Sequence, residues 1–464
     1  MTNQVTNRPK FQIKDFNEIV GKSSGEIKQI IAYHQYKTLW TYAVNCILGL
    51  WLITSPFLYD YKSSALVISD VVSGALIVAF ECLSFSSKRY LLRWFTVLVA
   101  VWLLFAPLVF WSSTPAVYLM DTLIACFVIV FSVLVPGTPG QGGVEKSGPD
   151  QPPGWSYNPS SWIRRWLGIA LALLGFFISR YLAARQLGYS QHAWDPFFGN
   201  GSDSVLHSVV SRSLPISDAG FGSVAYMMEV LAGFMGDRAR WRTSPWIVMT
   251  FAVLVVPLGV TSVLLVILQP TIVGAWCGLC LIAAAALVAS VPLAVHEIIA
   301  MALFMVEAKK QGKNVWQVFW FGGSIIGAGA EDPDRRHFSL IQRWIASVQG
   351  VTVPWTIAVQ LGIGSWLMAR PDILHLGGRT ADCDHLLGAL VVTVTTIATA
   401  EVTRTARLLN IPLGFLLIVA AFLFARDLPI VFCSELISGV ILVFVSIPKG
   451  RIFERCNGWD KYVK

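Results

Sequence analysis

The sequence has few charged residues. Asp, Glu, Lys and Arg together make up 13% of its 464 residues, and hydrophobic residues make up 55%, whereas an ordinary soluble chain carries about 25% charged residues. Many apolar runs exceed the roughly 18 residues that a helix needs to cross a bilayer. This composition excludes an ordinary soluble enzyme and predicts a protein that crosses a lipid bilayer several times.

Two other patterns are also absent. The apolar runs show no period-two alternation, which argues against a membrane β-barrel. Residues 1–40 are polar and no apolar segment precedes the first span, so we expect no cleavable signal. The net charge of +8 is explained by basic loops on the cytoplasmic side of a membrane, and nucleic acid is not an expected partner.

Few of the cysteines lie close together in the sequence. Of eight cysteines, Cys277 and Cys280 form the one close pair, in the run WCGLC, and this spacing does not suggest a disulfide-stapled scaffold. A zinc site needs about four ligands, so we expect no metal here. The pair opens a long apolar segment, where it could be reduced by external thiols and oxidised by a lipid-soluble acceptor. A structural disulfide and a pair that no longer turns over are the alternatives.

The apolar runs predict about twelve membrane helices and therefore an all-α, polytopic membrane protein. The eighth helix is long enough to extend beyond the bilayer, and two connections divide the twelve into three blocks of four. The predicted ranges are 41–59, 65–84, 92–111, 116–136, 162–183, 219–236, 245–268, 274–305, 350–369, 384–404, 411–425 and 429–447.

Basic segments predict the orientation of these helices. Segments such as 86–93, 237–242 and 448–456 are rich in Lys and Arg, and all lie on the same side as the N-terminus. We therefore expect a multi-pass protein of the bacterial cytoplasmic membrane with both termini in the cytoplasm. Cys277 and Cys280 then lie at the outer face, where disulfide exchange is possible.

The predicted organisation has six parts. Their ranges are a cytoplasmic segment at 1–40, a four-helix module at 41–136, a flexible Gly/Pro-rich linker at 137–160, a central four-helix domain at 161–306, a cytoplasmic connection at 307–344, and a second four-helix module with a tail at 345–464.

An internal repeat relates the two outer blocks. GLWLITSPFLYD (49–60) matches AVWLLFAPLVFW (100–111), and DVVSGALIVAF (70–80) matches DTLIACFVIVF (121–131), both at an offset of 51 residues. Each repeat comprises two helices, so successive repeats share one orientation. The third block contains the same elements in GSWLMARPDIL (364–374), DHLLGALVVTV (384–394) and ELISGVILVF (435–444).

Each repeat carries a Trp-x4-Pro element or an acidic residue, or both. The Trp is expected to be an interfacial anchor, and the Pro is expected to end its helix. An acid is expected at the start of the next helix, where it suits the positive helix end. Proton handling is the alternative role, because intramembrane acids are often functional. The four acids are Asp70, Asp121, Asp384 and Glu435.

The repeated elements resemble the SPW repeat family of small four-span membrane modules. TSP (54–56) and FAP (105–107) stand where that family has its Ser-Pro motif. The resemblance covers about residues 40–136 and, with fewer matches, 350–447. It implies a membrane module and little chemistry.

The central block resembles the vitamin K epoxide reductase family. Four predicted helices, a long loop after the first of them, the segment VLHSVVSRSLPISDAGFGSVAY (205–226) and WCGLC opening the fourth helix carry this resemblance over about residues 160–306. Members of that family usually hold a second cysteine pair in the loop, which shuttles electrons to the CxxC. Residues 186–222 contain no cysteine, so this chain departs from the family there.

The resemblance implies a membrane thiol-disulfide oxidoreductase that passes electrons from an extracytoplasmic dithiol through Cys277 and Cys280 to a quinone. It implies that Cys280 faces the quinone, either ubiquinone or menaquinone, and that Cys277 exchanges with the incoming thiol. A separate thioredoxin-like periplasmic protein is a candidate donor. The alternative is a non-enzymatic membrane scaffold or redox sensor with a vestigial CxxC.

Four further residues are candidates for the site. Tyr226 and Trp276 are expected to line the quinone pocket, with packing and interfacial anchoring as the alternatives. Ser211 and Asp218 are expected to relay protons to the reduced quinone, with plain loop structure as the alternative. Cys383 and Cys433 could replace the missing shuttle pair, although isolated cysteines on membrane helices are more often packing residues.

Overall fold

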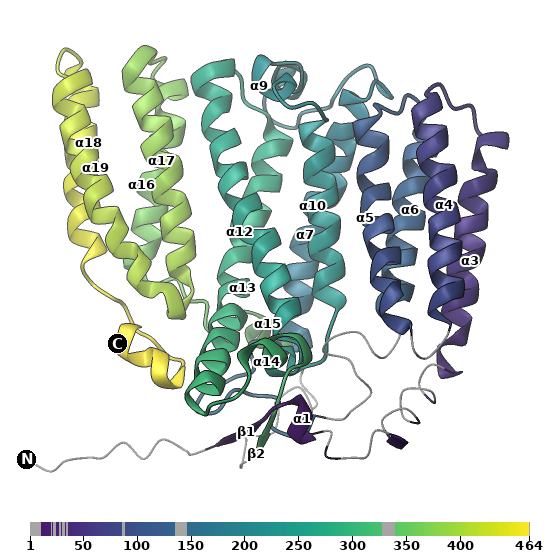
Figure 1. The fold of residues 1–464 in the computed structure, drawn as a ribbon. Coiled ribbons are helices and arrows are strands. Elements are labelled where there is room, and N and C mark those ends of the chain that lie inside the picture. The colour runs from purple at the N-terminus through teal and green to yellow at the C-terminus, as the bar shows by residue number, and fades with distance from the viewer. Residues whose placement is uncertain are drawn as a thin grey trace, which may run out of the picture.

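Figure 1 shows the computed structural model of the chain, in which nearly all regular structure is helical. The structure describes residues 11–19, 21, 25–26, 29, 33, 36–85, 89–134, 146–326 and 339–463. In these residues, strands β1 (Gln12–Lys14) and β2 (Ser324–Ile326) pair antiparallel. The predicted all-α, polytopic membrane fold is confirmed.

Nine helices in the described part of the chain are long and apolar enough to cross a membrane. Each of the twelve predicted ranges contains a helix, but α5 (Arg93–Val109), α10 (Asp218–Phe234) and α16 (Trp355–Ile373) are not among the nine. The protein therefore spans the membrane several times. The count of twelve spans stays a prediction.

The helices form three groups that stand side by side (Figure 1). The N-terminal module comprises α3 (Leu39–Thr54), η1 (Ser55–Phe57), α4 (Ser64–Ser84), η2 (Tyr90–Leu92), α5 and α6 (Pro115–Val133). The central domain comprises α7 (Trp162–Gln186), α8 (Gly201–Leu206), α9 (Val209–Arg212), α10, α11 (Arg240–Thr243), α12 (Pro245–Leu268), η3 (Gln269–Val273) and α13 (Gly278–Lys310). The C-terminal module comprises α16, α17 (Gly378–Thr399), η5 (Glu401–Leu409), α18 (Asn410–Phe424) and α19 (Pro429–Ser446).

The two ends of the helix bundle differ. One end carries the outer loop, residues 187–217, which connects α7 to α10 and includes α8 and α9; we call it the loop end (Figure 1). The other end carries the first and last described helices, α1 (Phe16–Ile19) and α20 (Asp460–Val463) (Figure 1). Several short elements also lie there: α14 (Val315–Phe321), α15 (Leu340–Ser347), η6 (Asn457–Trp459) and the β1–β2 pair.

Small residues let the paired helices of three of the four repeats approach closely. A Cβ on Gly74 would lie 2.5 Å from the carbonyl oxygen of Gly49, and a Cβ on Gly388 would lie 2.8 Å from that of Gly364. A Cβ on Gly439 would likewise lie 2.8 Å from the oxygen of its partner in α18. Such small residues are typical of membrane helix pairs. The three contacts lie four residues after Asp70, Asp384 and Glu435, so the repeat seen in the sequence is also a repeat of packing.

The acids of the repeat do not lie at the positive ends of their helices. Each is the seventh residue of its helix: α4 begins at Ser64, α6 at Pro115, α17 at Gly378 and α19 at Pro429. The helix dipole acts mainly within the first turn, so our expectation about these acids is wrong. All four carboxyl groups are instead buried between helices, at 0–2% exposure.

The predicted flexible linker is packed where the structure describes it. Residues 137–145 lie outside the described residues, but Trp155 and Tyr157 are 6% and 1% exposed. The Arg242 guanidinium donates to the carbonyl oxygens of Lys146, Ser147, Gly148 and Pro149. Residues 146–160 are therefore packed against the central domain through buried residues such as Trp155 and Tyr157. Most of the predicted segment 1–40, residues 86–88 and residues 327–338 also lie outside the described residues.

Candidate functional site

The start of α13 holds the cysteine pair. The chain leaves α12 through the single π-helical turn η3, then turns sharply at Gly274, whose φ of 70° favours glycine. Cys277 is the N-cap residue of α13, and its Sγ accepts a hydrogen bond from the Cys280 amide at 3.1 Å. The CxxC therefore sits at a helix N-terminus, where unpaired amides and the helix dipole stabilise a thiolate.

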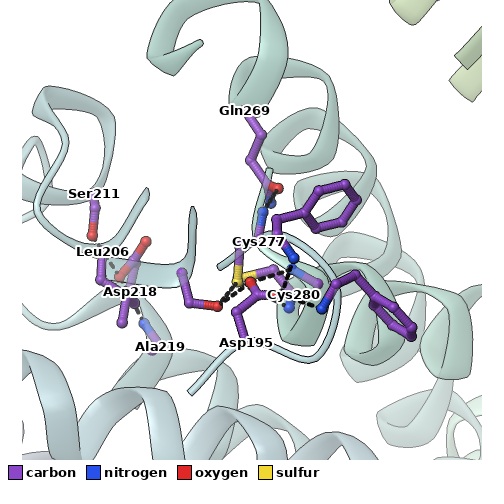
Figure 2. Close-up of a disulfide and its surroundings, with 12 residues drawn as sticks. Asp195, Leu206, Ser211, Asp218, Ala219, Gln269, Cys277 and Cys280 are labelled. Carbon is purple, nitrogen blue, oxygen red and sulfur yellow. Dashed lines mark hydrogen bonds between the residues drawn. A yellow bond between two sulfur atoms is a disulfide. The ribbon is translucent and has the colours of Figure 1, made fainter. Parts of the chain in front are cut away.

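Cys277 and Cys280 form a disulfide with a Cα–Cα distance of 5.2 Å (Figure 2). Cys277 is fully buried and packs against Leu182, Ala193 and Leu206. Cys280, one turn further along α13, is partly buried and lines a cavity. The two sulfurs thus have different surroundings, one beneath the outer loop and the other beside the cavity.

Asp195 connects the outer loop to the cysteine pair (Figure 2). Its Oδ1 accepts from the amides of Phe197 and Phe198, both at 2.9 Å. Its Oδ2 accepts from the Gly278 amide at 2.9 Å and from the Ser202 hydroxyl at 2.7 Å. Burial acts to raise the pKa of Asp195, but these four hydrogen bonds together lower it below its ordinary value. The carboxylate therefore stays ionised and bridges the loop to the first amide of α13.

Ser202 lies between Asp195 and the buried sulfur. Its hydroxyl oxygen is 3.3 Å from Cys277 Sγ and is itself fully buried. A Cβ added to the neighbouring Gly201 would lie 2.0 Å from the Trp276 carbonyl oxygen, so a larger side chain does not fit there. The start of α8 is therefore packed directly against the backbone that leads into the CxxC.

Gln269 supports the pair from the other side. Its Oε1 accepts a hydrogen bond from the Cys277 amide at 2.9 Å, and its side chain is 4% exposed. Sequence reasoning missed both Gln269 and Ser202. A polar Gln at the end of a very apolar span, just before Pro270, was the available signal for the first. A serine in a polar loop gave no signal for the second.

The cavity beside Cys280 has a volume of about 130 Å³. Residues of α7, α10, α12 and α13 line it together with the outer loop, and most of these side chains are apolar. Its polar or aromatic lining includes Tyr226, Ser211, Asp218 and Gln269. A mostly apolar cavity with a few polar groups is typical of sites for small organic ligands.

Ser211 and Asp218, the predicted proton relay, lie together in the cavity wall (Figure 2). The Ser211 hydroxyl donates to Asp218 Oδ1 at 3.0 Å. Gln186 at the end of α7 joins them, because its amide group donates to Ser211 Oγ at 2.6 Å and also to Asp218 Oδ1. Its amide oxygen accepts from the Ser217 hydroxyl. Gln186 was not predicted, and it fixes the orientation of both relay candidates.

Tyr226 and Trp276 lie in different places. Tyr226 lines the cavity, and its hydroxyl donates to the Ala283 carbonyl oxygen at 2.9 Å, while its ring packs on Gly175. Trp276 is not among the cavity-lining residues. Its indole donates to Asp372 Oδ2 at 2.6 Å and its ring contacts His385 at 5.2 Å, so it faces the C-terminal module.

The candidate shuttle cysteines are unpaired thiols. Cys383 is partly buried against Leu367, Leu387 and Leu417, which agrees with a packing role, and Cys433 is exposed. No group of three or more His, Cys, Asp or Glu that could hold a metal ion occurs within the described ranges.

The comparison with known families identifies the central block. Residues 166–295 match the vitamin K epoxide reductase family. The chain contains a vitamin K epoxide reductase domain. Residues 39–135 match the SPW repeat domain, so the predicted pairing of these two families is confirmed. Searches of curated proteins and of solved structures found no match.

The match of the central block to this family supports an oxidoreductase of the disulfide and quinone class. In the vitamin K epoxide reductase domain, the disulfide occupies the expected helix, and Cys280 borders the cavity. The mostly apolar walls of the cavity suit the ring of a quinone.

Proposed function

We propose that this protein is a membrane thiol-disulfide oxidoreductase that passes electrons from an extracytoplasmic dithiol, through Cys277 and Cys280, to a quinone. The position of Cys280 carries the proposal: its disulfide-bonded sulfur belongs to a residue that lines an apolar cavity between membrane helices. A lipid-soluble acceptor can enter such a site from the bilayer.

The reaction balances as one dithiol oxidised for each quinone reduced. A substrate thiolate attacks Cys277 Sγ, the Cys277–Cys280 bond breaks, and Cys280 leaves as a thiolate. The second substrate thiol then displaces Cys277, which completes the substrate disulfide. When the Cys277–Cys280 bond forms again, the pair gives up two electrons and two protons, which convert the quinone into a hydroquinone.

Residues around Cys277 suit it to accept the incoming thiol and to leave again. As a thiolate it would lie at the N-terminus of α13, where the Cys280 amide already donates to its sulfur. The Ser202 hydroxyl, with its single hydrogen, lies within reach of both that sulfur and Asp195. Cys277 is fully buried, so the outer loop must open before a separate thioredoxin-like donor can reach it.

Ser211 and Asp218 would exchange protons with a quinone in the cavity. Both line it, and Gln186 holds them in one hydrogen-bonded group. Tyr226 contributes its ring to the lining, because its hydroxyl is already bonded to the Ala283 carbonyl. The quinone is of the ubiquinone or menaquinone class. Trp276 would not contact it directly and would affect its binding only through the backbone of WCGLC.

Two observations favour the second candidate function, a non-enzymatic scaffold or redox sensor. Residues 186–222 contain no cysteine, and Cys277 is completely covered. Both features are also expected of a cysteine pair that receives electrons rarely, or only after a signal opens the loop.

Quinone reduction by the purified protein separates the two functions. With dithiothreitol as donor and a short-chain ubiquinone as acceptor, we expect protein-dependent hydroquinone formation, measured by ultraviolet absorbance above the uncatalysed rate. Cys280→Ser should abolish it, whereas Cys126→Ser in α6, which does not line the cavity, should retain it. Equal rates for wild type and Cys280→Ser would refute the proposal and leave the sensor as the better explanation.

A further inference from the structure

The N-terminal module contains two buried acids with no cation among their described partners. Asp70 on α4 and Asp121 on α6 are both 0% exposed and interact electrostatically. Neither oxygen of Asp121 has a hydrogen-bond partner, and Asp70 Oδ1 has none either. Two carboxylates that interact electrostatically and are removed from water cannot both remain ionised without a positive charge nearby.

The C-terminal module shows what satisfies the equivalent acids. Asp384 and Glu435 are 51 residues apart, as are Asp70 and Asp121. The guanidinium of Arg370 lies between them: Nε is 3.0 Å from Asp384 Oδ2, and Nη2 is 2.9 Å from Glu435 Oε1 and also bonds Asp384. Arg370 is itself fully buried. One module therefore has a built-in positive charge at this place.

The repeat identifies the position that differs. Arg370 directly precedes Pro371 of the Trp-x4-Pro element, and the corresponding residue before Pro56 is Ser55. Ser55 is fully buried, as Arg370 is, but it carries no charge. The second helix pair of the N-terminal module has Ala106 there, which is also buried and also uncharged.

A chain of hydroxyl groups leads from the loop end to these acids. Tyr61, in the connection between η1 and α4, is half-buried, and its hydroxyl donates to Asp70 Oδ2 at 2.5 Å. The Ser55 hydroxyl lies 2.9 Å from the same Tyr61 oxygen. Asp121 also acts electrostatically on Tyr189, whose hydroxyl donates to the Ser112 carbonyl oxygen. Tyr61, Tyr189 and Tyr118 are the described titratable groups around the two acids, and the Arg180 guanidinium lies 5.4 Å from the Tyr118 ring.

We propose that Asp70 and Asp121 form a buried proton-binding site in the N-terminal module, at the place that Arg370 fills permanently in the C-terminal module. A proton bound by one acid of the pair removes one negative charge, as the guanidinium does in the other repeat. Tyr61 connects the pair to the loop end, so the proton is exchangeable. The site is independent of the cysteine pair and of its chemistry.

Infrared spectroscopy of the full chain in lipid nanodiscs at neutral pH tests this site. We expect a carbonyl-stretch band of a protonated carboxylic acid that shifts in deuterated water. The band should be lost in Asp121→Asn, whose amide mimics the protonated acid, and kept in Asp60→Asn, which alters an exposed loop carboxylate. A wild-type minus Asp121→Asn difference spectrum without this band would overturn the proposal.

The C-terminal module provides an independent second variant. Arg370→Ser converts its site into the Ser55 type, so we expect Asp384 or Glu435 to take up a proton and a second band to appear. If Asp121→Asn does not fold, the presence or absence of this new band decides the question. A wild-type band that disappears when sodium chloride replaces choline chloride would show that sodium, not a proton, is the ligand, and would also overturn the proposal.

Discussion

Asp195 is the residue on which the loop side of the cysteine site most depends. One carboxylate accepts hydrogen bonds from two loop amides, one hydroxyl and the first amide of α13. The sequence presented it as an ordinary aspartate before Pro196, a pattern typical of turns. Its bond to Gly278, 83 residues away, is decided by tertiary contacts alone.

We predict that Asp195→Asn loosens the outer loop. Asparagine offers one acceptor oxygen where four donors converge, so we expect a loss of about 1–3 kcal/mol. The disulfide of the variant should be reduced faster by a water-soluble phosphine than that of wild type, as followed by thiol alkylation. Equal reduction rates at pH 7 would contradict the assigned role.

The pH dependence of this effect has a definite sign. The pKa of Asp195 in the folded protein is below its ordinary value, so its contribution is complete above the unfolded pKa of about 3.9. That contribution is lost as the pH falls from there through the lower folded pKa. The wild-type advantage over Asp195→Asn should therefore be constant near neutrality and shrink only in acid.

The basic residues that predicted orientation have structural roles that their positions in the sequence did not reveal. Arg165 donates to the carbonyl oxygens of Gly233, Met235 and Gly236, and Arg240 forms a buried ion pair with Glu297 at 2.6 Å. A hydropathy pattern treats every basic residue between two spans as loop charge. It does not distinguish a side chain in water from one that donates to buried carbonyl oxygens. The structure shows how these basic residues pack, and the orientation of the chain in the membrane stays a prediction.

At the scale of elements, α8 and the start of α13 act as one unit. Gly201 begins α8 directly against the Trp276 carbonyl, and Gly278 begins α13 against Asp195. Helix ranges could be predicted because long apolar runs and helix length are local properties. The contact between a short loop helix and a membrane helix is not local, and no pattern in 187–217 indicated it.

We predict that Gly201→Ala separates these two elements. The added Cβ would lie 2.0 Å from the Trp276 oxygen, so backbone must move. We expect faster reduction of the Cys277–Cys280 disulfide and a lower thermal unfolding midpoint. Gly259→Ala in α12, where a Cβ meets nothing within 4 Å, is the matched control and should behave as wild type. Similar behaviour of both variants would show that the contact does not hold the loop.

At the scale of the whole molecule, the C-terminal tail joins the linker between the first two blocks. The Ser156 amide donates to the Arg455 carbonyl at 3.0 Å, and Asn457 donates to the Pro153 carbonyl at 3.0 Å. Trp155 is 6% exposed in the same core cluster as Trp241 and Phe304 of the central domain. The end of the bundle opposite the outer loop is thus closed by segments about 300 residues apart in sequence.

We predict that Trp155→Ala loosens this end of the molecule. Removal of a buried Trp side chain typically costs 3–5 kcal/mol. The variant should be cleaved faster by protease in residues 146–160 and at the tail, while its quinone reductase rate changes little. Trp316→Ala, which removes a side chain 68% exposed, is the control. Protection equal to wild type would mean that the tail and linker are not held by this core.

The sequence by itself determined the membrane class, the helix ranges, the internal repeat and the CxxC at the start of a helix, because hydropathy, repeat offset and motif spacing are properties of the chain. Tertiary structure decided what each motif touches. It covered Cys277 and opened Cys280 to a cavity, and it brought Gln186, Ser202 and Gln269 to the site. It also decided that the repeat acids are buried in pairs between helices and do not lie at helix ends. Those contacts join residues that are distant in sequence, so no local pattern reveals them. A charge that is buried loses its hydration and then needs a partner in the protein.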